Sequence, residues 1–279
     1  MSGSFIEELV VALAAGVVGG LLATLAALKA APARLQRTNV NGSQVPVVLG
    51  FGLLVGAMAG VFALVASASF TESRAMDTSR VGTVIAIVGV MFAAGLYDDR
   101  RGDEPARGFR GHLGAARGGV LTGGLVKIAA GGLAGFIATL ALAGPLHKLE
   151  AFLLVPLTAN LFNLLDRAPG RAAKAGWLFV VPLLAFGSEL WGLAAAGLIG
   201  ALLAVTPFDV RERAMLGDAG ANPLGAIVGL GLAISLPEPW LALSVVVLLA
   251  LNAISERVSF STVIDSSPWL RALDRIGRR

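Results

Sequence analysis

The sequence predicts an all-α protein, a polytopic transmembrane helical bundle of about nine spans. The first reason is composition: 56% of the 279 residues are hydrophobic and 14% are charged, with a mean hydropathy of +0.80. Soluble domains carry about 25% charged residues, so a soluble chain of this composition would leave much apolar surface uncovered. The second reason is pattern: the apolar runs are continuous and do not alternate, which favours spanning helices over a β-barrel.

Nine apolar segments are candidate spans, because a helix needs roughly 20 apolar residues to cross the hydrocarbon core. They are 5–28, 46–68, 81–97, 118–143, 150–166, 174–187, 190–206, 219–236 and 239–255. The stretch 174–206 can be divided in two ways, as one long helix or as two short helices that break at Gly187-Ser188-Glu189. Residues 1–255 are therefore expected to form the bundle, followed by a basic tail over 256–279.

The distribution of Lys and Arg decides between the two divisions and sets the orientation. With two helices, the N-terminus lies outside and the C-terminus in the cytoplasm. The inner side then holds every one of the 22 basic residues except Arg74, Arg80, Lys127 and Lys148. One long helix would move the C-terminal Arg residues outside, against the positive-inside rule. We expect a multi-pass cell-membrane protein whose pI near 10.1 reflects its inner loops and not nucleic-acid binding.

The second half of the tail is amphipathic. Its pattern sets apolar residues at Trp269, Leu270, Leu273 and Ile276 against charged residues at Arg271, Asp274, Arg275 and Arg278. This pattern predicts a helix that lies on the inner leaflet. The alternative is a frayed basic tail.

Ionisable residues gather at the inner ends of four predicted spans. Asp98 and Asp99 end the third span, Asp166 ends the fifth, Asp218 precedes the eighth, and Lys127 lies about two turns into the fourth. Ionisable groups at membrane depth are costly, so they are candidate functional residues. Each also has a structural interpretation: a mixed-charge loop at Asp98-Asp99, a helix cap at Asp218, and an interfacial anchor at Lys127.

The segment NLFNLLD at 160–166 places Asn160, Asn163 and Asp166 three residues apart, so they share one helix face. This face is expected to point at the same inner site. Hydrogen bonding between helices is the alternative. Arg171, a few residues further on, is either a substrate contact or an anchor at the inner interface.

Carboxylates without His or Cys favour a hard cation such as Mg²⁺. The chain has no Cys and only two His, His112 and His147, which fall on opposite sides of the predicted membrane. Nearby Arg and Lys suit phosphate oxygens. These residue types suggest a lipid phosphate that reacts with a soluble phosphorylated substrate. The absence of a GxSxG motif disfavours serine-hydrolase chemistry.

Several stretches, taken in order, resemble the polyprenyl-phosphate N-acetylhexosamine-1-phosphate transferases. That family includes the phospho-MurNAc-pentapeptide translocase and the undecaprenyl-phosphate GlcNAc-1-phosphate transferases. The stretches that carry the resemblance are TNVNGSQVPVVLGFG at 38–52, GLYDD at 95–99, Lys127, NLFNLLD at 160–166 and MLGDAGANPLG at 215–225.

The resemblance implies a Mg²⁺-dependent transfer of a sugar-1-phosphate from a UDP-amino sugar to polyprenyl phosphate, with release of UMP. Mn²⁺ is the alternative ion. The reaction would take place at the cytoplasmic face, in cell-envelope glycan synthesis, and the family suggests a homodimer. Asp98 would bind or deprotonate the lipid phosphate, and Asp99 and Asp218 would hold the metal or its waters. Asp166 would contact the nucleotide or the metal. Substrate contacts are expected from Asn39, Lys127, Asn160, Asn163, Arg167 and Arg171.

The segment after Asp166 departs from the family pattern. Arg167 stands where the family has Gly, and Pro169 stands where it has a second Asp. The family's late cluster of His residues is also missing. A second hypothesis is therefore a non-catalytic paralogue that binds polyprenyl phosphate or a partner in envelope synthesis. An ion or solute transporter is disfavoured, because no acid or Lys falls at mid-membrane.

Overall fold

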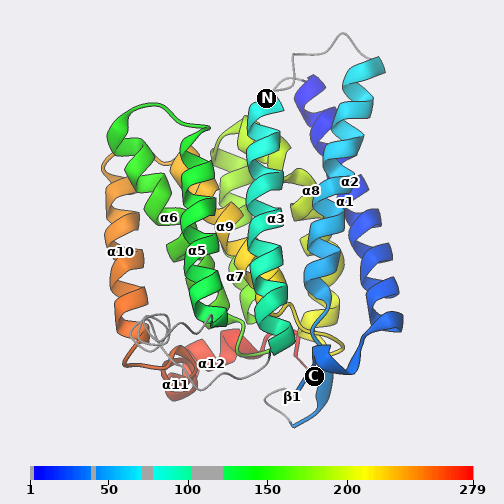
Figure 1. Ribbon diagram of the computed structural model, residues 1–279, viewed down its shortest axis with the longest axis vertical. Helices are drawn as coiled ribbons and strands as arrows, with labels where there is room; N and C mark the ends of the chain where they lie inside the picture. The colour runs from blue at the N-terminus through cyan, green and yellow to red at the C-terminus, as the bar shows by residue number, and fades with distance from the viewer. Residues whose placement is uncertain (1–2, 39–41, 71–77, 102–121, 279) are drawn as a thin grey trace.

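The computed structural model describes residues 3–38, 42–70, 78–101 and 122–278, and 82% of these residues are helical (Figure 1). The predicted all-α class is confirmed. The helices are α1 (Gly3–Ala30), α2 (Leu49–Phe70), α3 (Thr78–Arg101), α5 (Gly123–Thr139), α6 (Pro145–Leu165), α7 (Arg171–Phe186), α8 (Glu189–Val210), α9 (Asp218–Ser235), α10 (Trp240–Ser255), α11 (Phe260–Ser266) and α12 (Pro268–Arg275). A short turn η1 (Ala33–Leu35) leads into β1 (Gln36–Thr38), which pairs with β2 (Gln44–Pro46) as an antiparallel hairpin.

Each predicted apolar segment corresponds to one helix from α1 to α10 in the described part of the chain. The division of 174–206 into two helices is confirmed, since α7 ends at Phe186 and α8 begins at Glu189. Ser188 caps α8, because its side chain accepts a hydrogen bond from the Trp191 N–H. The fourth segment begins later than predicted, at Gly123, with Thr122 as its cap. Lys127 therefore lies only about one turn into α5.

Length and composition single out five helices that could cross a membrane, namely α1, α2, α3, α6 and α8. The count rises to six if α10 and α11, which meet at a bend of 91°, form one broken span. The chain is thus a multi-pass membrane protein by its apolar helices. Helices α5 and α7 have 17 and 16 residues, and α9 is enclosed by other helices. Length and composition therefore do not single out these three helices as spans.

Helices α1, α2 and α8 pack against one another through small residues. A Cβ atom added to Gly16 of α1 would overlap the backbone of Gly197 in α8, and one added to Gly56 of α2 would overlap Ala201. In apolar surroundings the hydrophobic effect does not drive helices together, so van der Waals contact between them must do so. Small residues allow this contact because they let the helix backbones approach closely.

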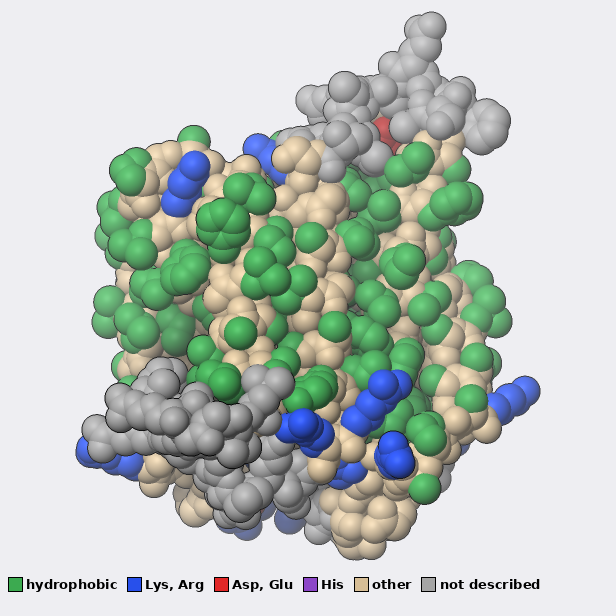
Figure 2. Space-filling view, in the orientation of Figure 1, with side chains coloured by type: hydrophobic (Ala, Val, Ile, Leu, Met, Phe, Trp, Pro, Cys, Tyr) green, Lys and Arg blue, Asp and Glu red, His purple; other side chains and the backbone are tan. Residues whose placement is uncertain are grey.

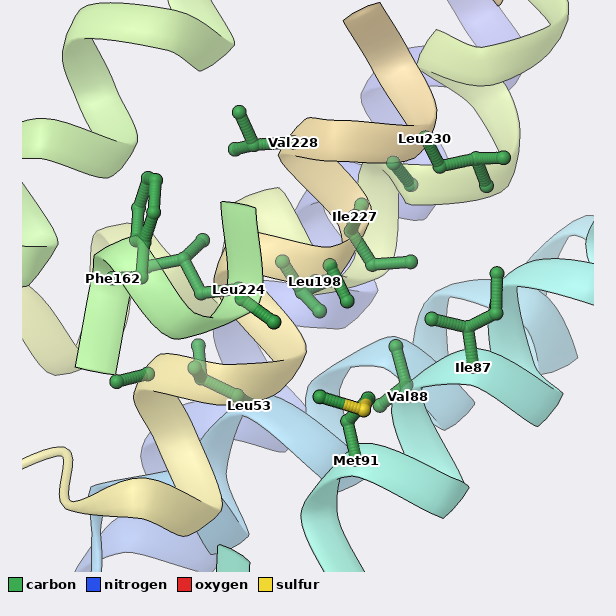
Figure 3. Packing of buried hydrophobic residues seen from close by; sticks show 14 of the residues in the cluster. Leu53, Ile87, Val88, Met91, Phe162, Leu198, Leu224, Ile227, Val228 and Leu230 are labelled. Carbon is green, nitrogen blue, oxygen red and sulfur yellow. The ribbon is translucent and has the colours of Figure 1, made fainter. Parts of the chain in front are cut away.

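Helix α9 runs through the centre of the bundle, packed between α6, α3 and α7. Figure 3 shows Leu224, Ile227 and Leu230 of α9 among side chains from α6, α8 and other helices, including Phe162 and Leu198. The indole of Trp191 donates a hydrogen bond to the Ile227 carbonyl over 3.1 Å. This packing fixes α9 in the bundle, and it fixes the start of α9 at the lower end in Figure 1.

The lower end of the bundle carries the hairpin, the start of α9 and the tail helices α11 and α12 (Figure 1). A parallel bridge between Val47 and Met215 joins the hairpin to the segment before α9. Figure 2 shows Lys and Arg side chains gathered along this lower rim, with fewer at the upper rim and apolar side chains between. The chain termini lie at opposite ends (Figure 1).

Candidate functional site

Four helix ends meet at the lower end of the bundle and bring predicted site residues together. The Lys127 ammonium of α5 lies 2.7 Å from Asp98 Oδ2 of α3, and it also pairs with Asp218 of α9. Asn163 of α6 donates a hydrogen bond from Nδ2 to Asp218 Oδ1. We call Asp98, Lys127, Asn163 and Asp218 the acid–lysine cluster. Its charged side chains remain between 19% and 27% exposed, so a ligand can reach them.

Asp99 caps the N-terminus of α9 from a different helix. Its Oδ1 accepts from the Asp218 N–H at 3.1 Å, and its Oδ2 accepts from the Ala219 N–H at 2.9 Å. These groups are among the unpaired donors at the start of α9, where the helix dipole also favours a negative charge. The sequence pattern also allowed Asp218 itself to be the cap. With Asp99 in that role, the Asp218 carboxylate is free to face Lys127.

Glycine is required where Asp99 meets α9. Gly217 has φ +62°, and a Cβ atom there would lie 2.8 Å from Asp99 Oδ2. A residue with a side chain would be strained by this backbone conformation, and it would also push the carboxylate off its donors. The Gly-Asp pair at 217–218 therefore serves two purposes, since Gly217 forms the turn and Asp218 presents its acid.

Arg37 ties the hairpin to the end of α3. Its guanidinium donates to the carbonyl oxygen of Asp99 and, over 3.0 Å, to that of Gln36. An Arg at this place satisfies a carbonyl that the end of a helix leaves unpaired. The sequence pattern predicted only an inner-face charge at Arg37, because the partner of Arg37 is 62 residues away. Asn39, a predicted substrate contact, lies outside the described residues.

Asp166 lies behind the acid–lysine cluster. It is only 9% exposed, and its carboxylate accepts a hydrogen bond from the backbone of Gly217. It is also close enough to Asp99 and Asp218 to feel their negative charges. The position of Asp166 therefore supports the turn that presents Asp218.

Asn160 does not join Asn163 and Asp166. Its Nδ2 donates over 2.6 Å to the side chain of Asn252 in α10, which in turn donates to the Leu157 carbonyl. The interhelical alternative therefore holds for this residue. The reason is geometric: positions three apart drift by roughly 60° at each step, so Asn160 and Asp166 are roughly 120° apart around α6.

Arg171 is also directed away from the acid–lysine cluster. Its Nε and Nη2 each lie 2.9 Å from a carboxylate oxygen of Asp274 in α12, and its Nη1 donates to Ser261 over 2.9 Å. Arg278 Nη2 lies 2.8 Å from Asp274, and Lys174 donates to the Asp274 carbonyl. We call these five residues the tail clamp. Since Arg171 is only 7% exposed and fully paired, it is not placed to contact a substrate, whereas Arg167 is exposed.

The tail clamp keeps Asp274 ionised. Burial disfavours the charged carboxylate, but the hydrogen bonds from Arg171 and the nearby positive charges outweigh burial and hold the pKa of Asp274 below its usual value. Arg278 also donates to the Pro169 carbonyl over 2.9 Å. The tail is therefore fastened to the α6–α7 connection, the segment that departs from the family pattern.

Asp209, near the end of α8, was not selected from the sequence. It is 1% exposed, its carboxylate accepts a hydrogen bond from the Gly170 backbone, and its Oδ2 has no hydrogen-bond partner within the described ranges. An acid at the end of the apolar run TPFDV was the available signal. Asp274 gave no such signal, because it sits among charged residues in an amphipathic tail.

Metal binding is the next question that the geometry raises. Among the residues that the structure describes, no group of three His, Asp or Glu side chains is arranged to hold a metal ion. Two carboxylates, Asp98 and Asp218, already share one cation, the Lys127 ammonium. Mg²⁺ is usually held by one or two carboxylates together with waters and substrate phosphates, so this pair fits such an ion. Asp99 fits less well, because the N–H groups of α9 occupy both of its oxygens.

Comparison with known proteins leaves the family open, because the chain matches no protein-family model and no curated protein. The site itself has more negative than positive charge, with Asp98, Asp99 and Asp218 around Lys127. Such a site can hold a cation and, through that cation and Lys127, a phosphate group.

Proposed function

We propose that the protein transfers a sugar-1-phosphate from a UDP-amino sugar to polyprenyl phosphate at the cytoplasmic face of the cell membrane, in cell-envelope glycan synthesis. The observation that carries the proposal is the acid–lysine cluster. Lys127 lies between Asp98 and Asp218, and these residues come from three helices that are far apart in sequence. Their convergence at one end of an apolar bundle supports the resemblance noted in the sequence.

In this proposal all nine segments cross the membrane, with the N-terminus outside and the acid–lysine cluster on the cytoplasmic side. Two observations support the orientation. The termini lie at opposite ends of the bundle, as an odd number of crossings requires (Figure 1). Lys and Arg side chains gather at the end that carries the cluster (Figure 2), in agreement with the positive-inside rule.

The proposed reaction forms a bond between an oxygen of the lipid phosphate and the β-phosphorus of the UDP-sugar. The bond from that phosphorus to the oxygen of UMP breaks, and UMP leaves with the electron pair. Asp98 either deprotonates the lipid phosphate, by accepting its proton, or binds the lipid phosphate. Lys127 binds the diphosphate. Asp218 would hold Mg²⁺ together with waters and the diphosphate, and the ion would offset the charge of the diphosphate as the bond breaks.

The remaining residues hold this arrangement in place. Asn163 orients the Asp218 carboxylate through its hydrogen bond. Asp99 fixes the start of α9, and Arg37 fixes the end of α3 that carries both Asp98 and Asp99. Catalysis of phosphoryl transfer depends mainly on such positioning and on electrostatic stabilisation.

The test uses purified protein in lipid nanodiscs with polyprenyl phosphate, Mg²⁺ and a panel of UDP-sugars, and it measures UMP release. We expect release with at least one donor, and loss of release in Asp98→Asn and Asp218→Asn. Asn160→Ala is the matched control. Asn160 is on the same helix as Asn163, but its side chain bonds Asn252 and not the acid–lysine cluster, so release should persist. Absence of release with every donor would overturn the proposal.

The second candidate is a non-catalytic protein that binds polyprenyl phosphate or a partner in envelope synthesis. The tail clamp favours it, because the tail is fastened to Pro169, where the family has its second Asp. In that case, polyprenyl phosphate would bind and protect the protein against thermal unfolding, while no UDP-sugar would yield UMP.

A further inference from the structure

Helix α12 has an unusual distribution of side chains for a helix at the edge of a protein. Its acid, Asp274, is 8% exposed, whereas Trp269 is 65% exposed, Leu273 53% and Ile276 61%. Residues at these spacings share one side of a helix. The side of α12 that carries Trp269 and Leu273 is therefore turned away from the protein, and the side that carries Asp274 and the half-buried Leu270 is packed against it.

The tail clamp makes this orientation firm. Asp274 is bound by Arg171 and Arg278, while Lys174 binds the backbone of the same residue. A rotation of α12 that buried Trp269 or Leu273 would break these contacts and leave buried charges unpaired. The exposed apolar side is thus a fixed surface of the folded chain.

The position of α12 identifies the environment of this surface. Helix α11 leaves α10 at an angle of 91°, so it runs across the end of the bundle and not along it. Helix α12 follows α11 directly at the lower end of the apolar helices (Figure 1). A surface at this depth meets the boundary between headgroups and acyl chains, where Trp is a preferred residue.

Charge identifies the kind of lipid. Arg271 is half-buried and lies on the side of α12 that carries Asp274, three residues further on. Within the described residues its guanidinium donates to the Asp265 carbonyl, a contact that does not neutralise its positive charge. Arg275 is exposed at the end of α12. Asp274, the only acid in this helix, is already paired within the tail clamp. The exposed surface of α12 is therefore apolar, with the positive charges of Arg275 and Arg271 along its edge.

We infer that α12 is a binding surface for anionic phospholipids of the inner leaflet. Trp269, Leu273 and Ile276 enter the boundary between headgroups and acyl chains, and Arg271 and Arg275 bind lipid phosphates. A soluble protein partner is disfavoured, because the surface lies at the end of an apolar helical bundle and carries the basic and apolar side chains that anionic membranes select. The inference does not depend on the proposed transferase reaction.

The test measures Trp fluorescence of the full-length protein in nanodiscs of phosphatidylcholine that contain a small fraction of one brominated lipid, either phosphatidylglycerol or phosphatidylcholine. Trp240→Phe retains Trp269, and Trp269→Phe retains Trp240, which is 60% exposed at the other end of α10. Trp177 and Trp191 are common to both variants and cancel in the comparison. We expect brominated phosphatidylglycerol to quench more than brominated phosphatidylcholine only when Trp269 is present.

Two double variants locate the charge effect without touching the tail clamp. Arg271→Gln with Arg275→Gln should remove the preference for the anionic lipid, roughly fivefold for each Arg. Arg271→Lys with Arg275→Lys should retain it. Equal quenching of Trp269 by the two lipids would overturn the inference. So would an absence of quenching, which means that α12 faces water or protein, or a preference that persists in Trp269→Phe.

Discussion

Two networks of charged side chains lie at the same end of the bundle and differ in exposure and in charge balance. In the acid–lysine cluster, the side chains of Asp98, Lys127 and Asp218 are 24%, 27% and 19% exposed. In the tail clamp, the side chains of Asp274 and Arg171 are 6% and 7% exposed. The cluster has two acids for one cation, whereas the clamp surrounds one acid with several cations.

The difference teaches how residues of the same type divide between function and structure. The acids of the cluster are open and under-neutralised, so an added cation lowers their mutual repulsion. Asp274 of the clamp is enclosed and fully paired, so it has no capacity left for a ligand. Exposure and charge balance, and not residue type, separate the two networks. Each prediction below breaks one of them or tests the difference.

The largest effect is expected from breaking the tail clamp. Asp274→Ala leaves Arg171, which is 7% exposed, without its carboxylate and close to Lys174 and Arg278. Removing one partner of a buried pair costs about 3–5 kcal/mol. We expect the tail to detach, and limited proteolysis should cleave the chain within 256–278.

The control is Asp265→Ala, which removes an exposed acid of the same tail and should change stability by less than about 0.5 kcal/mol. A second variant, Arg171→Met with Asp274→Leu, replaces the pair by apolar residues and should restore resistance to proteolysis. Cleavage of Asp274→Ala at the same rate as the unchanged protein would show that the clamp contributes little.

Breaking the acid–lysine cluster should lower the free energy of unfolding less than breaking the tail clamp does. It should, however, reduce activity. Lys127→Ala removes the ammonium between Asp98 and Asp218, so the diphosphate loses one positive partner. UMP release should fall about 100-fold, because a preorganised charge at a reacting group contributes on this scale. The midpoint of thermal unfolding should change little, since partly exposed pairs contribute about 0–1 kcal/mol.

Higher Mg²⁺ concentrations should partly restore release in Lys127→Ala, because a second cation can then reach the two acids. Lys148→Ala, at the opposite end of the bundle, is the matched control. If Lys127→Ala instead unfolds the protein and leaves the activity of the folded fraction intact, the cluster is structural and the contrast with the tail clamp is wrong.

The turn at Gly217, where Asp99 meets the start of α9, provides the next prediction. Gly217→Ala requires a side chain at φ +62° with its Cβ 2.8 Å from Asp99 Oδ2. We expect a loss of about 1–3 kcal/mol, measured as a lower midpoint of thermal unfolding. Gly89→Ala, in α3, meets no described atom within 4 Å and should raise stability by about 0.5–1 kcal/mol.

The fold and part of the site could be predicted from the sequence for a physical reason. Continuous apolar runs identify helices, and the polar residues at their ends identify which ends lie on the same side of the membrane. Asp98, Lys127 and Asp218 could therefore be selected together. The role of Arg171 could not, because its partner Asp274 lies 103 residues away in a tail whose pattern is that of a free amphipathic helix. Likewise, Asn160, Asn163 and Asp166 are spaced three residues apart. Because each step turns them around the axis of α6, Asn160 bonds Asn252 and Asn163 bonds Asp218.

The smallest effect concerns the response of the tail clamp to acid. The pKa of Asp274 is lowered in the folded chain, because Arg171 and the other cations stabilise its charged form more than burial opposes it. A lowered folded pKa means that the contribution to stability is complete above the unfolded pKa and is lost as the pH falls through the folded pKa. The tail should therefore stay protected from cleavage at neutral pH and detach only at pH values below the usual range of an Asp. An acid-stable protease such as pepsin can follow this transition, and Asp274→Asn should remove it by leaving the tail detached at every pH. A transition that persists in Asp274→Asn would assign the acid response to another carboxylate, one whose pKa is also lowered in the folded chain.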